Sequence, residues 1–160
     1  MTQAESARVP GLDVSTGQLL VSVAARLTRL HTRLLAKLDT PLTFRQYRSL
    51  IRVHAGCSSL TELASFGNLT IPTVSEGVDV LVRRGLLTRV PNREDRRAIS
   101  LEITPAGIEA VAAADAVLED VANDLIRSVS AEGRALLPET LASIFEAATA
   151  YFQHEQETNE

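Results

Sequence analysis

The sequence predicts a mainly α-helical fold with a small β-hairpin, in the order of a winged helix-turn-helix placed between long terminal helices. Two short helical patterns occur at 60–66 and 71–84, and two strand-like segments follow at 86–90 and 98–103. Six arginines fall within 83–97, in a chain whose formal net charge is −4. This cationic cluster lies where such a unit would meet phosphate, so pattern and charge together indicate DNA binding.

Length and composition favour one domain with an aliphatic core. The chain has 160 residues, 45% of them apolar and 4% aromatic, with no tryptophan. No segment approaches the roughly 18 apolar residues of a membrane span. Residues 1–15 lack the apolar run of a secretion signal, and we expect them to form a flexible tail. The single cysteine cannot form an internal disulfide, which fits a reducing cytosol.

Charge is distributed unevenly along the chain. Residues 1–82 carry eight basic and six acidic side chains, and residues 83–97 carry six and two. Residues 98–160 carry two basic and twelve acidic side chains, a local balance of −10. Because salt screens surface charges beyond about 8–10 Å, a cationic patch can bind phosphate while an acidic region points elsewhere.

The chain begins with a long helical pattern and a shorter one. Apolar residues over 16–38 recur at the spacing of an amphipathic helix, which Thr40-Pro41 ends. Thr43 is placed to cap a second helix that runs to about His54.

A tight turn separates the third and fourth helices. After the short helix 60–66, both Gly67 and Asn68 tolerate positive φ and predict the turn. Thr70 is placed to cap the fourth helix, which Gly85 closes.

The two strands flank an exposed polar loop at 91–97. Thr104 then caps a fifth helix with Pro105 at its first position. A last helix starts at Ser130 and runs to about Phe152.

The terminal helices are longer than one small core requires. We predict that 16–38 and 104–153 are dimerisation helices around a DNA-binding domain at 42–103, because their apolar stripes exceed what that domain can cover. The alternative is a monomeric helical bundle with a hairpin. A two-fold dimer matches the symmetry of the operators that helix-turn-helix proteins read.

Seven short motifs resemble those of the MarR family of bacterial transcriptional regulators, in family order over about residues 42–107. They are Leu42-Thr43-x-x-Gln46-Tyr47, Leu60-Thr61-Glu62-Leu63-Ala64, Pro72-Thr73-Val74-Ser75, Val78-Asp79-x-Leu81, Arg84-Gly85-Leu86-Leu87-x-Arg89, Asp95-Arg96-Arg97 and Ile103-Thr104-Pro105-Ala106-Gly107. The resemblance implies a cytoplasmic, nucleoid-associated homodimer that binds a pseudo-palindromic operator. Repression is the family default.

The helix 71–84 is expected to lie in the major groove, with hydroxyls near its N-terminus on phosphates or base edges. The resemblance implies that Arg97 enters the minor groove while Asp95 positions it. The alternative is that the loop arginines only make the loop soluble. The predicted DNA-binding residues are Thr43, Arg45, Thr70, Thr73, Ser75, Glu76, Arg83, Arg84, Arg93, Asp95, Arg96 and Arg97.

The reading helix departs from the family pattern at three positions. Glu76 and Val80 stand where basic residues are common, and Gly77 stands where a larger apolar residue is usual. Glu76 either accepts a hydrogen bond from cytosine N4, or pairs with Arg83 or Arg84, or faces solvent. With few cations on this helix, the predicted DNA affinity depends on the arginines of the wing, which consists of the two strands and the loop 91–97 between them. This affinity should fall as the salt concentration rises.

The resemblance also implies a small, aromatic or anionic effector that binds between the dimer helices and the winged helix. Five side chains are candidates for the pocket wall, or else are structural or solvated. They are Arg29, His31, Tyr47, Arg48 and His54.

Other activities have little support in the sequence. His31, His54 and His154 are too scattered for a metal site or a triad, so no enzyme, cofactor or metal is predicted. Cys57 is either structural or a thiol that oxidises, and no resolving cysteine accompanies it. The main alternative is a winged helix that binds protein, or a regulator whose DNA binding is degenerate.

Overall fold

The computed structural model describes the backbone of residues 14–67, 69–92 and 99–158, and side chains as far as Tyr151. The described residues form six helices and one hairpin, which confirms the predicted fold class. In order these are α1 (Thr16–Leu35), α2 (Phe44–His54), α3 (Leu60–Gly67), α4 (Ile71–Arg83), β1 (Leu87–Pro91), β2 (Ile99–Ile103), α5 (Pro105–Arg127) and α6 (Ala131–Thr158).

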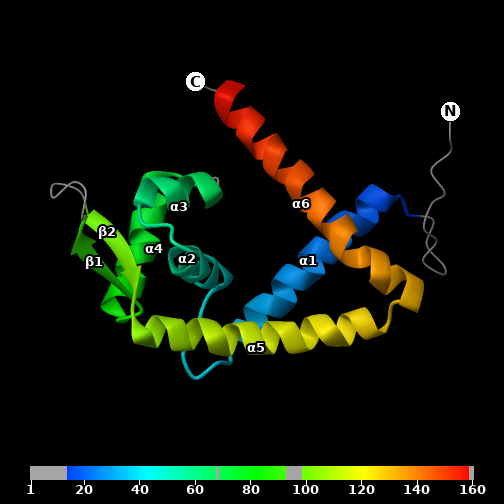
Figure 1. Cartoon of the computed structure of the whole chain (residues 1–160), viewed down its shortest axis with the longest axis horizontal. Coiled ribbons are helices and arrows are strands. Elements are labelled where there is room, and N and C mark those ends of the chain that lie inside the picture. The colour runs from blue at the N-terminus through cyan, green and yellow to red at the C-terminus, as the bar shows by residue number, and fades with distance from the viewer. Residues whose placement is uncertain (1–13, 68, 93–98, 159–160) are drawn as a thin grey trace.

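The elements divide into a head and arms, as Figure 1 shows. The head contains α2, α3, α4 and the hairpin, gathered at one end of the molecule. The arms are α1, α6 and the half of α5 that is distant from the hairpin. In the hairpin β1 and β2 are antiparallel, with Leu87 opposite Ile103 and Pro91 opposite Ile99.

The buried core lies in the head. Leu50, Leu63, Leu81 and Leu87 are almost completely buried, one each from α2, α3, α4 and β1. Two further helices contribute to this core where they join the head. These contributions are Leu35 at the end of α1 and Ala110, Val111 and Ala114 in the half of α5 nearer the hairpin.

Side-chain caps begin the helices where the sequence predicts them. The hydroxyls of Thr43, Thr70 and Thr104 accept hydrogen bonds from backbone amides in the first turns of α2, α4 and α5. Each such bond satisfies an amide that has no partner within its helix. The three predicted caps are therefore confirmed.

Gly85 ends α4 as predicted. Its φ is 71°, and its amide donates to Val82 O at 2.9 Å while the Leu86 amide donates to Leu81 O at 2.9 Å. This pair of bonds is a Schellman motif, which favours glycine at the left-handed position. It turns the chain directly into β1.

Gly107 allows α5 to approach the start of the hairpin. A Cβ at this position would lie 2.2 Å from the backbone oxygen of Leu86. The Thr104 hydroxyl donates to Gly85 O at 2.6 Å in the same junction. The first turn of α5 is thus held against the turn that ends α4.

Several predicted boundaries are wrong. The first helix ends at Leu35 instead of 38, because the chain turns at Ala36 and Leu38 packs against the core from outside the helix. Ser15 does not belong to a tail, since its side chain and that of Gln18 form a capping box at the start of α1. Residues 1–13 lie outside the described residues.

Two further boundaries differ. Gly67 is the last residue of α3 and does not have a positive φ, so it does not form the predicted turn; Asn68 lies outside the described residues. Pro91 belongs to β1 and not to the loop. Proline is tolerated in an edge strand, because its missing N–H then faces solvent and costs no hydrogen bond of the sheet. The last helix continues through Pro138 to Thr158, beyond the predicted 152.

The arms expose much of their apolar surface. These exposed side chains are Leu20, Val21 and Val23 on α1, Leu125 on α5, and Leu136, Leu141, Ile144, Phe145 and Tyr151 on α6. Within the described part of the chain, no helix is both long and apolar enough to cross a bilayer. These exposed apolar side chains on α1, α5 and α6 are not covered by other parts of the same chain.

Candidate nucleic-acid interface

The N-terminus of α4 presents hydroxyls at the surface of the head. Thr70 is exposed, and its Oγ1 lies 2.9 Å from Thr73 Oγ1 and accepts from the Thr73 amide at 3.5 Å. Ser75 follows on the next turn and is half-buried. The positive end of the helix dipole and its free amides favour an anion at this position.

Glu76, the residue after Ser75, lies exposed on α4. The ion pairs among the described residues are Arg89–Asp79 and Arg127–Asp124, so Glu76 does not pair with Arg83 or Arg84 there. Of the intramolecular alternatives, exposure to solvent is the one that the structure shows. Contact of Glu76 with a base remains a prediction.

Arg84 and Arg83 have different surroundings at the end of α4. Arg84 donates from Nη2 to Pro41 O at 2.7 Å and from Nη1 to Gln46 Oε1 at 3.2 Å. Arg84 therefore ties α4 to the connection between α1 and α2. Arg83 is exposed.

Gln46, which is not among the predicted site residues, positions two of them by hydrogen bonds. Its Oε1 accepts from the Thr43 amide at 2.9 Å, while its own amide donates to Thr43 Oγ1 at 3.1 Å. The same oxygen accepts from Arg84, so one carboxamide joins the start of α2 to the end of α4. The Thr-x-x-Gln spacing indicates a capping box and could have identified it. Arg45, two positions after Thr43, is exposed.

An ion pair that has no signal in the sequence pattern attaches the hairpin to α4. Arg89 Nη2 on β1 lies 2.6 Å from Asp79 Oδ1 on α4. At the far end of the strands, Asn92 Nδ2 donates to Ser100 Oγ at 3.0 Å. The predicted wing residues Arg93, Asp95, Arg96 and Arg97 lie outside the described residues.

Glu62 stabilises the start of α3. Its carboxylate accepts from the Ser58 and Ser59 amides at 2.8 and 3.1 Å. These two hydrogen bonds hold the pKa of Glu62 below its ordinary value. Burial and the nearby Glu62 raise the pKa of the half-buried Cys57 thiol. A raised thiol pKa lowers the thiolate fraction and favours the structural interpretation of Cys57.

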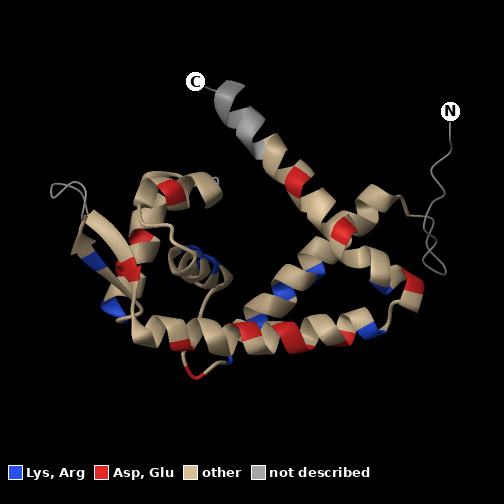
Figure 2. Cartoon of the chain, viewed as in Figure 1, with Lys and Arg blue, Asp and Glu red and all other residues tan. Residues whose placement is uncertain are grey.

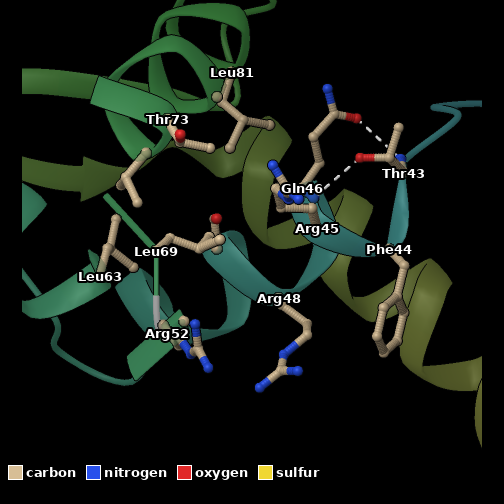
Figure 3. Close-up of a pocket in the computed structure, with 14 residues that line it drawn as sticks. Thr43, Phe44, Arg45, Gln46, Arg48, Arg52, Leu63, Leu69, Thr73 and Leu81 are labelled. Carbon is tan, nitrogen blue, oxygen red and sulfur yellow. Dashed lines mark hydrogen bonds between the residues drawn. The ribbon is translucent and has the colours of Figure 1, made fainter. Parts of the chain in front are cut away.

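A groove lies between α2 and α4, and Leu63 and Gly67 of α3 also line it. Figure 3 shows that Arg48 and Arg52 project from α2 along one edge, while Leu63, Leu69 and Thr73 lie toward the other. Its volume is about 290 Å³. Its lining residues are Thr43, Phe44, Arg45, Gln46, Arg48, Ser49, Arg52, Leu63, Gly67, Leu69, Thr73, Val74, Gly77 and Leu81.

A second, more open depression lies between α2 and α5 and also includes His31 of α1. Tyr47 Oη donates to Asp115 Oδ1 at 2.6 Å across it. Burial, and then this bond to a carboxylate, raise the pKa of Tyr47 well above its ordinary value. The depression also includes Phe44, Leu118 and Glu119.

The predicted effector pocket is therefore divided between the two cavities. His31 and Tyr47 line the depression, whereas Arg48 lines the groove. Arg29 and His54 are exposed and line neither of these cavities. Asp115 is not among the predicted site residues, because its proximity to Tyr47 depends on how α5 packs against α2. In the described residues, no three His, Cys, Asp or Glu side chains gather as a metal site.

Charge separates along the folded chain as well. Figure 2 shows that basic residues lie along α1 and in the head, while acidic residues predominate along α5. The acidic region thus lies mainly in the arms, as the charge distribution of the sequence suggests.

Comparisons with known proteins agree on one family. The model described as "MarR family" matches residues 42–99. The HTH-type transcriptional regulator YdcH of Bacillus subtilis is 32% identical over 116 residues, which cover 69% of this chain and 78% of YdcH. The multiple antibiotic resistance protein MarR of Salmonella typhimurium is 28% identical over 95 residues, or 59% of this chain and 65% of MarR.

Solved structures share the fold. Wild-type MarR from E. coli in its apo form superposes with a TM-score of 0.70 at 22% sequence identity. The match covers 83% of this chain and 98% of that one. The arrangement of head and arms is thus common to both proteins.

Proposed function

Because this chain belongs to the MarR family of winged helix-turn-helix transcriptional regulators, we propose that it is a homodimeric regulator that binds a pseudo-palindromic DNA operator. Members of this family bind DNA and act as dimers. The observation that carries the proposal is the geometry of the head. The head presents the capped N-terminus of α4, the start of α2 and the hairpin.

In this proposal α4 enters the major groove, where each base pair presents a distinct pattern of donors and acceptors. Thr70, Thr73 and Ser75 supply hydroxyls at its N-terminus, and Glu76 faces the bases. Arg45, beside the cap of α2, contacts a phosphate on the flank of the groove. Arg83 adds charge at the far end of α4, whereas Arg84 acts mainly by holding α4 and α2 together.

The wing supplies the remaining contacts. Arg97 enters the minor groove and Asp95 positions it, while Arg93 and Arg96 contact phosphates. The ion pair between Arg89 and Asp79 fixes the base of the hairpin against α4. A wing and a reading helix that are tied together meet adjacent grooves in a fixed relation.

The arms form the dimer in this proposal. The apolar side chains that α1, α5 and α6 expose find their cover on a second copy. The domain division follows: the head reads DNA, and the arms set the spacing of the two heads. We further propose that the protein is a cytoplasmic repressor that a small ligand releases from DNA.

A winged helix that binds protein is the second candidate. It is favoured by the exposed carboxylate of Glu76 and by the exposed Ile71 at the start of α4. An acidic residue on the reading face repels phosphate, and an exposed apolar one suits a protein surface. The two candidates differ in whether the arginines of the wing contribute to binding of the partner.

Fluorescence anisotropy tests the proposal with the DNA upstream of the gene, at two salt concentrations, against a scrambled duplex. We expect selective binding that weakens steeply with salt. Arg97→Ala should raise the Kd about tenfold or more, whereas the control Arg127→Ala, in the arm, should leave it unchanged. Equal weak binding to both duplexes, unaffected by Arg97→Ala, would support the protein-binding alternative.

A further inference from the structure

Helix α5 leaves the core of the head at a defined residue. Its buried side chains end at Ala114, and none of the residues 115–127 is buried. The next residue, Asp115, is exposed. Its Oδ1 accepts the 2.6 Å hydrogen bond from Tyr47 Oη of α2. This bond between head and α5 therefore lies at the position where the arm begins.

Hydrogen bonds hold α5 against the head at two points along its length. At its start, the Thr104 hydroxyl donates to Gly85 O at 2.6 Å. Beyond the first turn, and within the described part of the chain, the side-chain hydrogen bond between α5 and the head is the one from Tyr47 to Asp115. The two points are about 15 Å apart at 1.5 Å per residue. Together they fix the direction in which the arm leaves the head.

The core contacts of α5 define this direction poorly on their own. The buried residues of the helix are Gly107, Ala110, Val111 and Ala114, all of them small. Small side chains let two elements approach closely, but they supply few interdigitating atoms to resist a tilt. A contact at a distance from these residues therefore has more influence on the angle of the arm.

The surroundings of the bond favour its persistence. Tyr47 is half-buried and packs against the core, and Phe44 and Leu118 lie in the same depression. Burial, and then the carboxylate of Asp115, keep the pKa of Tyr47 well above its ordinary value, so the phenol retains its proton and donates. A hydrogen bond to a charged acceptor is stronger than a neutral one, and partial exclusion of water strengthens it further.

A small rotation at Asp115 has a large effect at the end of the arm. The end of α5 at Arg127 lies about 18 Å beyond Asp115 at 1.5 Å per residue. A tilt of about 10° would move that end by about 3 Å over this length. Each base pair extends a DNA duplex by about 3.4 Å. A tilt of this size is therefore enough to displace one head by about one base pair relative to the other.

We propose that Tyr47 and Asp115 are positioning residues whose hydrogen bond sets the angle between head and arm and thereby selects the spacing of the DNA half-sites that the dimer accepts. This inference rests on the proposed function, in which the arms form the dimer and each head reads one half-site. Two-fold symmetry repeats the bond in both subunits. A fixed angle favours one half-site spacing, whereas a loose angle accommodates several but must be ordered on binding.

Operators of altered spacing test the proposal. The probes are the operator found by anisotropy and derivatives with one base pair inserted or deleted at its centre. We define the spacing penalty as the ratio of the Kd for a derivative to the Kd for the operator. It should be about tenfold or more in the wild type. In Tyr47→Phe, which keeps the ring and loses the hydroxyl, it should fall below about threefold. An unchanged penalty in Tyr47→Phe would overturn the proposal.

Further variants separate the bond from the stability of the head. Asp115→Asn keeps an acceptor oxygen and should retain most of the spacing penalty, whereas Asp115→Leu should lose it as Tyr47→Phe does. Val53→Ala, in the core of the head, lowers stability without touching the bond and should leave the penalty unchanged. Circular dichroism checks that all these variants fold. An equal loss of the penalty in Val53→Ala, or a wild-type penalty in Asp115→Leu, would refute the role of the bond.

The spacing of the two heads is also measured without DNA. Ser65→Cys places a spin label on the exposed surface of α3, and Cys57→Ser removes the native thiol. Double electron–electron resonance then gives the distribution of distances between the heads of a dimer. We expect this distribution to be narrow, and to become broader when Tyr47→Phe is added.

The outcomes distinguish this inference from the proposed function. Equal widths with and without Tyr47→Phe would overturn the inference even where DNA binding is confirmed. A broader distribution in a protein that binds no DNA would contradict the proposed function and support the role of the bond in setting the angle. Absence of a dipolar signal would show that the protein is not a dimer and would overturn both.

Discussion

The head and the arms are both mostly helical, yet they use their apolar residues in opposite ways. In the head, α2, α3, α4 and the hairpin each contribute nearly inaccessible side chains to one core. In the arms, α6 has no buried side chain among residues 131–151, and its Phe145 is 70% exposed. The same residue types thus stabilise one fold in the head and remain available for association in the arms.

The two regions therefore have different sources of stability. The head contains its own core, its caps and its cross-links, such as the ion pair between Arg89 and Asp79. The arms have capped ends but little tertiary packing, and helices in proteins gain most of their stability from tertiary packing. Mutations in the head should act on unfolding, and mutations in the arms should act on assembly.

The largest expected effect comes from the core of the head. Leu50→Ala removes a completely buried side chain of α2 and should lower the free energy of unfolding by about 2–5 kcal/mol. Urea denaturation followed by circular dichroism measures this. A loss below about 1 kcal/mol would show that the head does not depend on its core and would remove the contrast with the arms.

The next effect concerns assembly. Phe145→Asp places a charge in the exposed apolar stripe of α6 and should raise the Kd of the dimer about a hundredfold or more, because the charge would have to be buried. Sedimentation equilibrium measures this Kd. Glu139→Ala, on the same helix, is the control. If the variant associates as tightly as the wild type, α6 is not part of the interface.

A smaller change should stabilise the head. Gly77→Ala replaces a glycine inside α4 whose Cβ position is open and should raise the free energy of unfolding by about 0.5–1 kcal/mol. The dimer Kd should not change. Thermal denaturation measures the gain in stability. A loss of stability would contradict the open space around the Cβ position of residue 77.

The smallest expected effect depends on pH. Glu62→Gln weakens the two hydrogen bonds that α3 receives from the Ser58 and Ser59 amides and should cost about 0.5 kcal/mol at pH 7. A lowered pKa means that the stability from the carboxylate is complete above the unfolded pKa of about 4.3 and is lost as pH falls through the folded value. Urea titrations at pH 7 and pH 3 should show the difference between wild type and variant shrinking in acid. A constant difference would contradict this origin.

Sequence reasoning succeeded where the chemistry is local. The caps at Thr43, Thr70 and Thr104 depend on residues three positions apart, and the periodic spacing of apolar residues gives the helices. It failed where distant segments meet. Arg84 reaches Gln46 across 38 positions, and Tyr47 reaches Asp115 across 68; neither pair has a signal in the spacing.

The divided effector pocket has the same origin. Arg48 and Tyr47 are adjacent in the sequence, but consecutive positions on a helix point to different sides. Arg48 therefore lines the groove while Tyr47 lines the depression. Only the packing of α4 and α5 on opposite sides of α2 shows that these are two cavities and not one.

The hydrogen bond between Tyr47 and Asp115 also affects the intrinsic tyrosine fluorescence of the protein. The chain has two tyrosines and no tryptophan, so its ultraviolet emission comes from one phenol at the junction of head and arm and one on α6. A phenol that donates to a carboxylate emits weakly, as Tyr47 does to Asp115, whereas Tyr151 is 78% exposed and has no such acceptor among the described residues. Brightening of the emission would therefore report separation of α2 from α5, and a Tyr151→Phe protein would isolate that signal without any added dye.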